Sequence, residues 1–245
     1  MILKKDNIEL TCLEIDIVEQ RLDLDGKHIL ELGCGQGDLT RRIAGQGNDR
    51  RLVATEVDEQ QHAINITNNK LPNVRFELAG AQAIPASDET FDRVLMFKSL
   101  HHVPVGLIQA ALLEIKRVLK PGGLLYISEP LFQGDFNEVL RLFHDEERVR
   151  AAAFNAITAT VRAGNFTLQE QLFFRSSVFM PTFSMFEQSV INVTHTDHQI
   201  TAAMMKAVKV AFEKAVAVNG GVFTTDNRVD LLRKQSRNRA ECIES

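Results

Sequence analysis

The sequence has 245 residues, of which 44% are apolar and 24% are charged, and its formal net charge is −4. This mild acidity gives no general attraction to nucleic acid or to an anionic membrane, so we expect neither as a partner. No apolar run approaches the ~20 residues of a membrane span, and the N-terminus lacks the apolar core of a signal peptide. The three cysteines, Cys12, Cys34 and Cys242, are far apart, which favours a reducing, cytoplasmic setting.

The first half of the chain predicts strands that alternate with helices. Apolar runs predict strands at residues 29–32, 52–57, 74–78, 93–97 and 124–128. Helical spacing of apolar residues predicts helices over residues 7–22, after the glycines at 33–37, and over 59–70 and 106–120. Such an alternation with short connections predicts a mostly parallel α/β sheet that helices cover on both faces.

The second half has a different pattern. We expect a long helix over residues 135–163, a strand over 166–180, a helix over 201–218 and a last strand within 222–234. Residues 182–200 show no regular pattern, and the tail from residue 235 is polar. We interpret the chain as one domain: a core over residues 1–130, a helical cap with a late strand inserted after strand five over 131–218, and the last strand and tail over 219–245.

A glycine-rich turn follows the first predicted strand, in the run I-L-E-L-G-C-G-Q-G-D-L-T at residues 29–40. A strand, such a turn and a helix N-terminus place several backbone N–H groups around one point, which suits a polar ligand. The phosphate loop of NTPases requires a Lys that is absent here. The dinucleotide fingerprint requires its third glycine where Asp38 stands.

The third possibility for this turn is the G-x-G-x-G loop that binds S-adenosylmethionine (SAM). Glu31 favours it, because an acid on the preceding strand suits a cationic amino group better than a pyrophosphate. A dinucleotide site, or a turn without a ligand, remains an alternative. Asp58 follows Gly37 by 21 residues, close to the spacing expected for a ribose-binding acid. Asp58 could equally cap the helix at 59–70, and Glu56 is the less favoured ribose acid.

Six segments occur in the order typical of one enzyme family: L-E-L-G-C-G-Q-G, E-V-D, A-I-P, F-D-R-V-L, L-H-H-V and L-K-P-G-G. Over roughly residues 7–130 the chain therefore resembles the class I SAM-dependent methyltransferases, near the small-molecule group that includes enzymes of ubiquinone and menaquinone biosynthesis. The resemblance implies a Rossmann-like doubly wound sheet, SAM as cofactor, and methyl transfer to a small-molecule acceptor. An NAD(P)-binding oxidoreductase and a non-catalytic SAM-binding protein are the alternatives.

The resemblance also implies roles for particular residues. Glu31 would meet the amino group of SAM, Asp58 the ribose hydroxyls and Val57 the adenine. The full set of implied cofactor contacts is Glu31, Gly33, Cys34, Gly35, Gly37, Glu56, Val57, Asp58, Ala81, Gln82, Phe97 and Lys98. One departure concerns the adenine, because Gly80 stands where relatives often have an Asp.

Candidate catalytic residues follow the fourth and fifth predicted strands. His101, His102 and Glu129 lie at the strand ends where ligands of open α/β sheets bind, and a histidine can act as a base near neutral pH. A packing role for the two histidines is the alternative. We expect no metal site: His195 and His198 lack a third ligand and suit a surface loop. In the cap, Phe183 and Phe186 are expected either to line an acceptor pocket or to fill a core.

Overall fold

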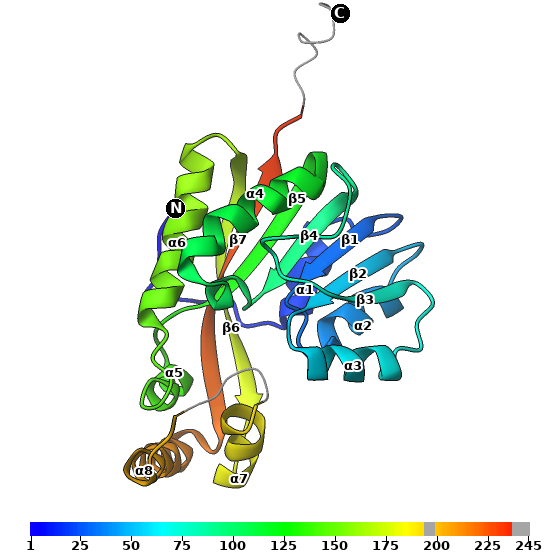
Figure 1. The fold of residues 1–245 in the computed structure, drawn as a ribbon. Coiled ribbons are helices and arrows are strands. Elements are labelled where there is room, and N and C mark those ends of the chain that lie inside the picture. Colours follow the sequence, from blue (N-terminus) through cyan, green and yellow to red (C-terminus); the bar gives the residue numbers. More distant parts are fainter. Residues whose placement is uncertain (194–198, 237–245) are drawn as a thin grey trace, which may run out of the picture.

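A seven-stranded sheet forms the centre of the computed structural model, which describes residues 1–193 and 199–236. The strand order is β3-β2-β1-β4-β5-β7-β6, with β1 to β5 parallel and β7 antiparallel to both its neighbours (Figure 1). The strands are β1 (His28–Leu32), β2 (Arg51–Glu56), β3 (Val74–Leu78), β4 (Phe91–Phe97), β5 (Leu119–Pro130), β6 (Phe166–Phe179) and β7 (Val222–Lys234). This sheet confirms the predicted Rossmann-like α/β fold.

Helices cover both faces of the sheet and bury two separate cores. The helices are α1 (Glu14–Arg21), α2 (Asp38–Gly45), α3 (Glu59–Asn68), α4 (Ile108–Val118), α5 (Asp135–Leu140), α6 (Glu147–Arg162), α7 (Phe183–Phe186) and α8 (Ala202–Asn219). Apolar residues of α4 and α6 pack in one core, and those of α1 and α2 pack in the other. Over the described ranges, no helix is long and apolar enough to cross a membrane.

The prediction of a helix over residues 7–22 is wrong in its first half, because the helix begins at Glu14. The backbone before it pairs with the edge strand β6 instead: Cys12 N–H donates to the Arg175 carbonyl at 3.1 Å, and Arg175 N–H donates to the Leu10 carbonyl at 2.8 Å. These bonds satisfy backbone groups that β6 would otherwise expose at its edge. The Leu10 side chain, which the helix prediction placed on its apolar face, is 47% exposed.

The prediction of one helix over residues 135–163 is also wrong. The helix is interrupted between Leu140 and Glu147, and Figure 1 shows α5 and α6 as two separate helices. Glu146 precedes α6 directly, and its carboxylate lies 2.6 Å from the Arg150 guanidinium, an i,i+4 pair, and 3.5 Å from the His101 ring. Buried charges require such partners.

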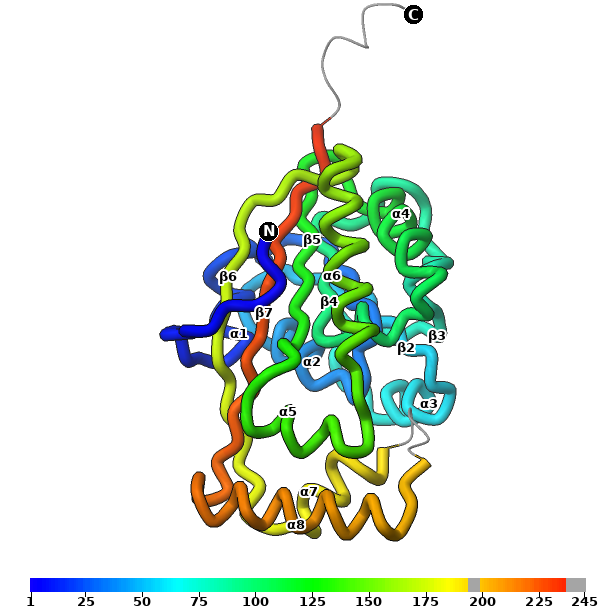
Figure 2. Tube along the Cα trace, turned by 90° about the vertical axis from the view of Figure 1, so that its left-hand side faces the viewer, coloured from blue at the N-terminus to red at the C-terminus, as the bar shows by residue number. Residues whose placement is uncertain are grey.

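Strands β6 and β7 continue beyond the end of β5. Pro130, the last residue of β5, pairs with Asn227, whereas β6 and β7 remain paired as far as Phe179 and Val222. Helices α5, α7 and α8 lie together at that end of the molecule (Figures 1 and 2), where they share a third apolar core with the strand ends. Helix α6, by contrast, packs with α4 in the main core. The segment predicted as one cap over residues 131–218 is therefore divided: α6 belongs to the main core, whereas α5, α7 and α8 belong to the third core.

Candidate functional site

The glycine-rich turn lies at the carboxyl end of β1, next to the segment that follows β4. Gly33, Gly35 and Gly37 all have positive φ, at 70°, 52° and 74°. A Cβ at Gly33 would lie 2.8 Å from the Ser99 Cβ, so the two segments touch there. A Cβ at Gly35 would have no atom within 4 Å. The turn thus has an open side at Gly35, at the switch point between β1 and β4 where open α/β sheets bind ligands.

Glu31 is a buried carboxylate just before this turn. It is 2% exposed, and its Oε2 accepts a hydrogen bond from the Thr40 hydroxyl at 2.6 Å. Burial raises the pKa of Glu31 to about 7, and the nearby carboxylates of Glu14 and Glu56 add to this effect. Burial also raises the pKa of Glu14. The interior beside the turn therefore carries several acids and favours a positively charged ligand group.

Glu56 connects the end of β2 to the glycine-rich turn. Its Oε2 accepts the Gly35 N–H at 2.7 Å, and its Oε1 accepts the N–H groups of Val57 and Asp58 at 2.7 and 3.1 Å. Its side chain is 7% exposed, whereas Val57 is 66% exposed. Strand β2 ends at Glu56, so Glu56 is the acid at the strand tip and lies closest to the turn.

Asp58 caps helix α3. Its Oδ1 accepts the N–H groups of Gln60 and Gln61 at 2.9 and 3.2 Å, which confirms the helix-cap interpretation. The expectation that Asp58 stands nearer than Glu56 to the strand tip is wrong, because β2 ends two residues before Asp58. A ribose contact by Asp58 stays a prediction.

The segment that replaces the expected adenine-binding Asp lies beside β2. Ala79 N–H donates to the Glu56 carbonyl at 3.1 Å, and the Ala81 side chain is buried. The Gln82 side chain folds over Gly80, where a Cβ would come 2.6 Å from Gln82 Oε1. Gln82 thus occupies the space that a side chain at position 80 would take. The adenine contacts of Ala81 and Gln82 stay predictions.

The residues that end β4 bring a cation to the same edge of the sheet. Lys98 follows Phe97 with φ of +52°, a conformation that non-glycine residues adopt at a cost, and its N–H donates to the Ser128 carbonyl at 2.7 Å. The Lys98 ammonium lies 3.8 Å from Glu14 Oε2. The strained backbone therefore places the partly exposed Lys98 side chain between the glycine-rich turn and the neighbouring cavity, which Lys98 lines.

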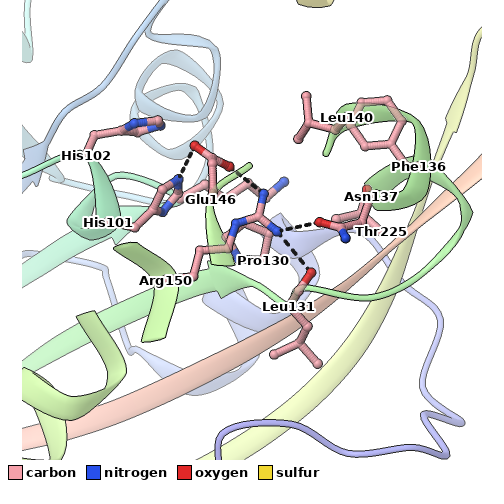
Figure 3. Close-up of a pocket in the computed structure, with 11 residues that line it drawn as sticks. His101, His102, Pro130, Leu131, Phe136, Asn137, Leu140, Glu146, Arg150 and Thr225 are labelled. Carbon is pink, nitrogen blue, oxygen red and sulfur yellow. Dashed lines mark hydrogen bonds and ion pairs between the residues drawn. The ribbon is translucent and has the colours of Figure 1, made fainter. Parts of the chain in front are cut away.

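His101 is held between the carboxylates of Glu129 and Glu146, and Figure 3 shows its contact with Glu146. Its ring is 4% exposed, with Nδ1 2.5 Å from Glu129 Oε2 and Nε2 3.5 Å from Glu146 Oε1. Glu129 Oε1 also accepts the Leu100 N–H at 3.0 Å. Burial opposes the charged ring, but Glu129 and Glu146 outweigh it and raise the pKa of His101 to about 9. A charged imidazolium has no lone pair, so in this state His101 positions the two acids and accepts no proton.

Glu146 and Arg150 belong to this cluster, and the sequence analysis missed both. Arg150 donates to Glu146 at 2.6 Å and to the Leu131 carbonyl and the Asn137 side chain at 3.0 Å (Figure 3). Burial opposes ionisation of Glu146, but hydrogen bonds from His101 and His144 hold its pKa well below the usual range. The charged run H-D-E-E at 144–147 was the available signal, because it interrupts the apolar spacing of the expected helix.

A cavity of about 220 Å³ opens next to this cluster. Its walls come from the segments after β4 and β5 and from α5 and α6: Lys98, His101, His102, Pro130, Leu131, Phe136, Asn137, Leu140, Glu146, Arg150 and Thr225. Phe136 and Leu140 give it an apolar side (Figure 3). The cavity is the space that the structure offers to an acceptor beside the switch point.

Phe183 and Phe186 do not line this cavity, although Phe186 packs against Phe136, which does. Phe186 is fully buried in the third core, and both rings pack against Phe212 with centroids 5.1 to 5.6 Å apart. Of the two interpretations of these phenylalanines, the core-filling one fits this packing. His195 and His198, expected to lie in a surface loop, fall outside the described residues.

The parallel half of the sheet and its glycine-rich turn form a Rossmann-like α/β domain. Residues 29–123, less than half of the chain, match the family described as "Methyltransferase domain". The match covers β1 to the start of β5 and includes the turn, Glu31 and Glu56.

Curated relatives match the same half of the chain. A ubiquinone biosynthesis O-methyltransferase of Coxiella burnetii is 28% identical over 47% of this chain and 49% of its own length. The O-methyltransferase cnsE of Penicillium expansum is 33% identical over 42% of this chain and 38% of its own length. The chain spans about half the length, or less, of the curated relatives it matches.

Solved structures match more of the chain by fold. The YcgJ protein of Bacillus subtilis covers 91% of this chain and 97% of its own, with a TM-score of 0.64 and 15% identity. The cyclase SpnF covers 91% of this chain and 80% of its own, with a TM-score of 0.63 and 24% identity. At these identities the likeness shows the fold alone.

Proposed function

We propose that this protein binds SAM at the glycine-rich turn and transfers its methyl group to a small molecule held in the cavity beside His102. The observation that supports this proposal best is a pair of buried acids, Glu31 and Glu56. They lie at the carboxyl ends of β1 and β2, beside the same turn. SAM when bound supplies an activated methyl group on a sulfonium centre, so the protein has to bind, align and exclude water.

Charge favours SAM over a dinucleotide at this turn. SAM carries an ammonium and a sulfonium, whereas a dinucleotide brings an anionic pyrophosphate. Glu31, Glu56 and Glu14 lie close enough together that each of the other two raises the pKa of Glu31. A cation entering this space relieves their repulsion, and an anion would add to it.

Glu56 is the stronger candidate for the ribose. It ends β2, is almost fully buried and already accepts the Gly35 N–H on the open side of the turn. A carboxylate accepts hydrogen bonds from both hydroxyls of a ribose, and an acid at the end of the second strand performs this task in Rossmann-type sites. Asp58 is engaged in capping α3.

The acceptor has to reach the methyl group from the side of β4 and β5. The cavity lies there, with Phe136 and Leu140 on its apolar side and the exposed ring of His102 on its polar side. His102 is therefore the better candidate to receive a proton from an acceptor, while Glu129 holds the two residues before it by accepting from the Leu100 N–H and contacting the His101 ring. A cytoplasmic location fits Cys12 and Cys34, which form no disulfide.

The experiment is a transfer assay with methyl-labelled SAM and a deproteinised small-molecule extract. Under the proposal, label moves into extractable small molecules with wild-type protein and at a much lower rate with Glu56→Gln. Binding of SAM without any transfer, over a broad panel of acceptors, would instead favour a non-catalytic SAM-binding protein.

A further inference from the structure

We infer that His101, His102 and Glu146 form a binding site for one divalent transition-metal ion, at the wall of the cavity. One ligand atom from each residue lies within 4.8 Å of the other two. Figure 3 shows both rings directed toward the Glu146 carboxylate. The inference goes beyond the proposed function and gives His102 a different role, because a ring nitrogen that binds the ion cannot also receive a proton from an acceptor.

The contact between His101 and Glu146 is long for a hydrogen bond, and its length is close to the separation of two ligands on one metal ion. Nε2 of His101 lies 3.5 Å from Glu146 Oε1, beyond the 2.7–3.2 Å typical of N–H···O bonds. Two ligands at ~2.0–2.1 Å from a tetrahedral zinc ion lie about 3.3–3.4 Å apart. These two atoms thus already stand at the separation that zinc requires, and the exposed His102 ring can turn to complete the set.

The outer contacts of the cluster match those of known metal sites. A metal-bound histidine usually donates its other ring N–H to a carboxylate, which fixes the ring. His101 has this arrangement, because its Nδ1 lies 2.5 Å from Glu129 Oε2. Arg150 donates to Oε2 of Glu146, so Oε1 is the oxygen directed to the metal. Both first ligands are therefore oriented before any ion arrives, and binding releases the Nε2 proton of His101, because only a neutral imidazole can bind a metal ion.

Two imidazoles and one carboxylate suit zinc, iron, cobalt, nickel or copper, and they leave coordination positions for other ligands. All three residues line the cavity, so those positions face it. A third imidazole nitrogen, Nε2 of His144, lies 2.9 Å from Glu146 Oε1. A bound ion would thus be able to coordinate an oxygen or nitrogen atom of a molecule in the cavity.

The test is a zinc titration of the full chain, purified without a histidine tag and treated with a chelator. We expect one Zn²⁺ per chain. Glu129→Gln should weaken binding by about 10- to 100-fold, the range for lost outer contacts, and His102→Ala, which removes a ligand, should weaken it at least as much. His62→Ala on α3, at the opposite edge of the sheet, is the matched control and should bind as wild type (Figure 1).

Cobalt gives a second readout, because Co²⁺ bound to nitrogen and oxygen ligands absorbs visible light and Zn²⁺ displaces it. His102 is exposed, so His102→Ala should keep the fold, which circular dichroism checks. Binding well below one equivalent by the folded wild type would overturn the inference. Equal affinity of wild type, His102→Ala and Glu129→Gln would overturn it as well, since the ion would then sit elsewhere.

Discussion

Glu56 at the end of β2 accepts the backbone N–H of Gly35 at 2.7 Å, and this bond joins the two strand ends that frame the proposed cofactor site. The same carboxylate accepts two further N–H groups at its own strand end. A cofactor ribose that binds here meets an acid whose position is already fixed, so little ordering remains to be done on binding.

Glu56→Gln should weaken SAM binding by about 10- to 100-fold. The amide keeps the size of the side chain but loses the charge, and hydrogen bonds to a charged group contribute about 1.5–3 kcal/mol. Calorimetry of SAM binding measures the change, with thermal unfolding to check the fold. Unchanged affinity in a folded variant would remove Glu56 from the site.

Asp58→Ala should act on stability instead. Removal of an N-cap acid costs about 1 kcal/mol of unfolding free energy, because the N–H groups of Gln60 and Gln61 lose their acceptor. Urea unfolding measures this cost, and SAM affinity should stay within about twofold of wild type. A tenfold loss of affinity would restore Asp58 as the ribose acid.

Glu31 should make stability depend on pH. Its pKa is about 7 in the folded chain, above its usual 4.5, so the folded state holds this proton more tightly than the unfolded state. Stability therefore falls as pH rises from 4.5 to 7 and stays lower above 7, by about 3 kcal/mol for this residue. Urea unfolding should show that Glu31→Gln stabilises the chain at pH 8 and has little effect at pH 4.5. An equal effect at both pH values would contradict the raised pKa.

Phe186→Ala should destabilise the third core by about 3–5 kcal/mol, the usual cost of truncating a fully buried phenylalanine. SAM affinity should not change, because this core lies at the far ends of β6 and β7. Thermal unfolding and calorimetry measure the two effects. Selective loss of acceptor turnover without loss of stability would show that Phe186 lines the acceptor site after all.

The sequence predicted the parallel sheet well because its strands are continuous apolar runs that end in turns. Gly33, Gly35 and Gly37 could be placed for the same reason, since a strand, a turn and a helix leave a local pattern. The last strand, over Val222–Lys234, and the helix before it were also recognisable from spacing alone.

What failed depended on contacts between distant residues. The spacing around Leu10 predicted a helix, but its backbone pairs with Arg175 on β6. No local sequence pattern indicates a partner so distant in the chain. Glu146 lay within the helix predicted over residues 135–163, but its carboxylate contacts the ring of His101, which is distant in the sequence. The strand expected over residues 52–57 ends one residue earlier, at Glu56, because boundaries are the least certain part of a sequence prediction.

The most direct test of the central claim is calorimetry of the wild-type chain with SAM and with its product S-adenosylhomocysteine, beside NAD and NADP. We predict that SAM and S-adenosylhomocysteine bind at one site per chain and that neither dinucleotide competes with them. Absence of binding by both at millimolar concentration, or binding of a dinucleotide in their place, would contradict the proposed cofactor site.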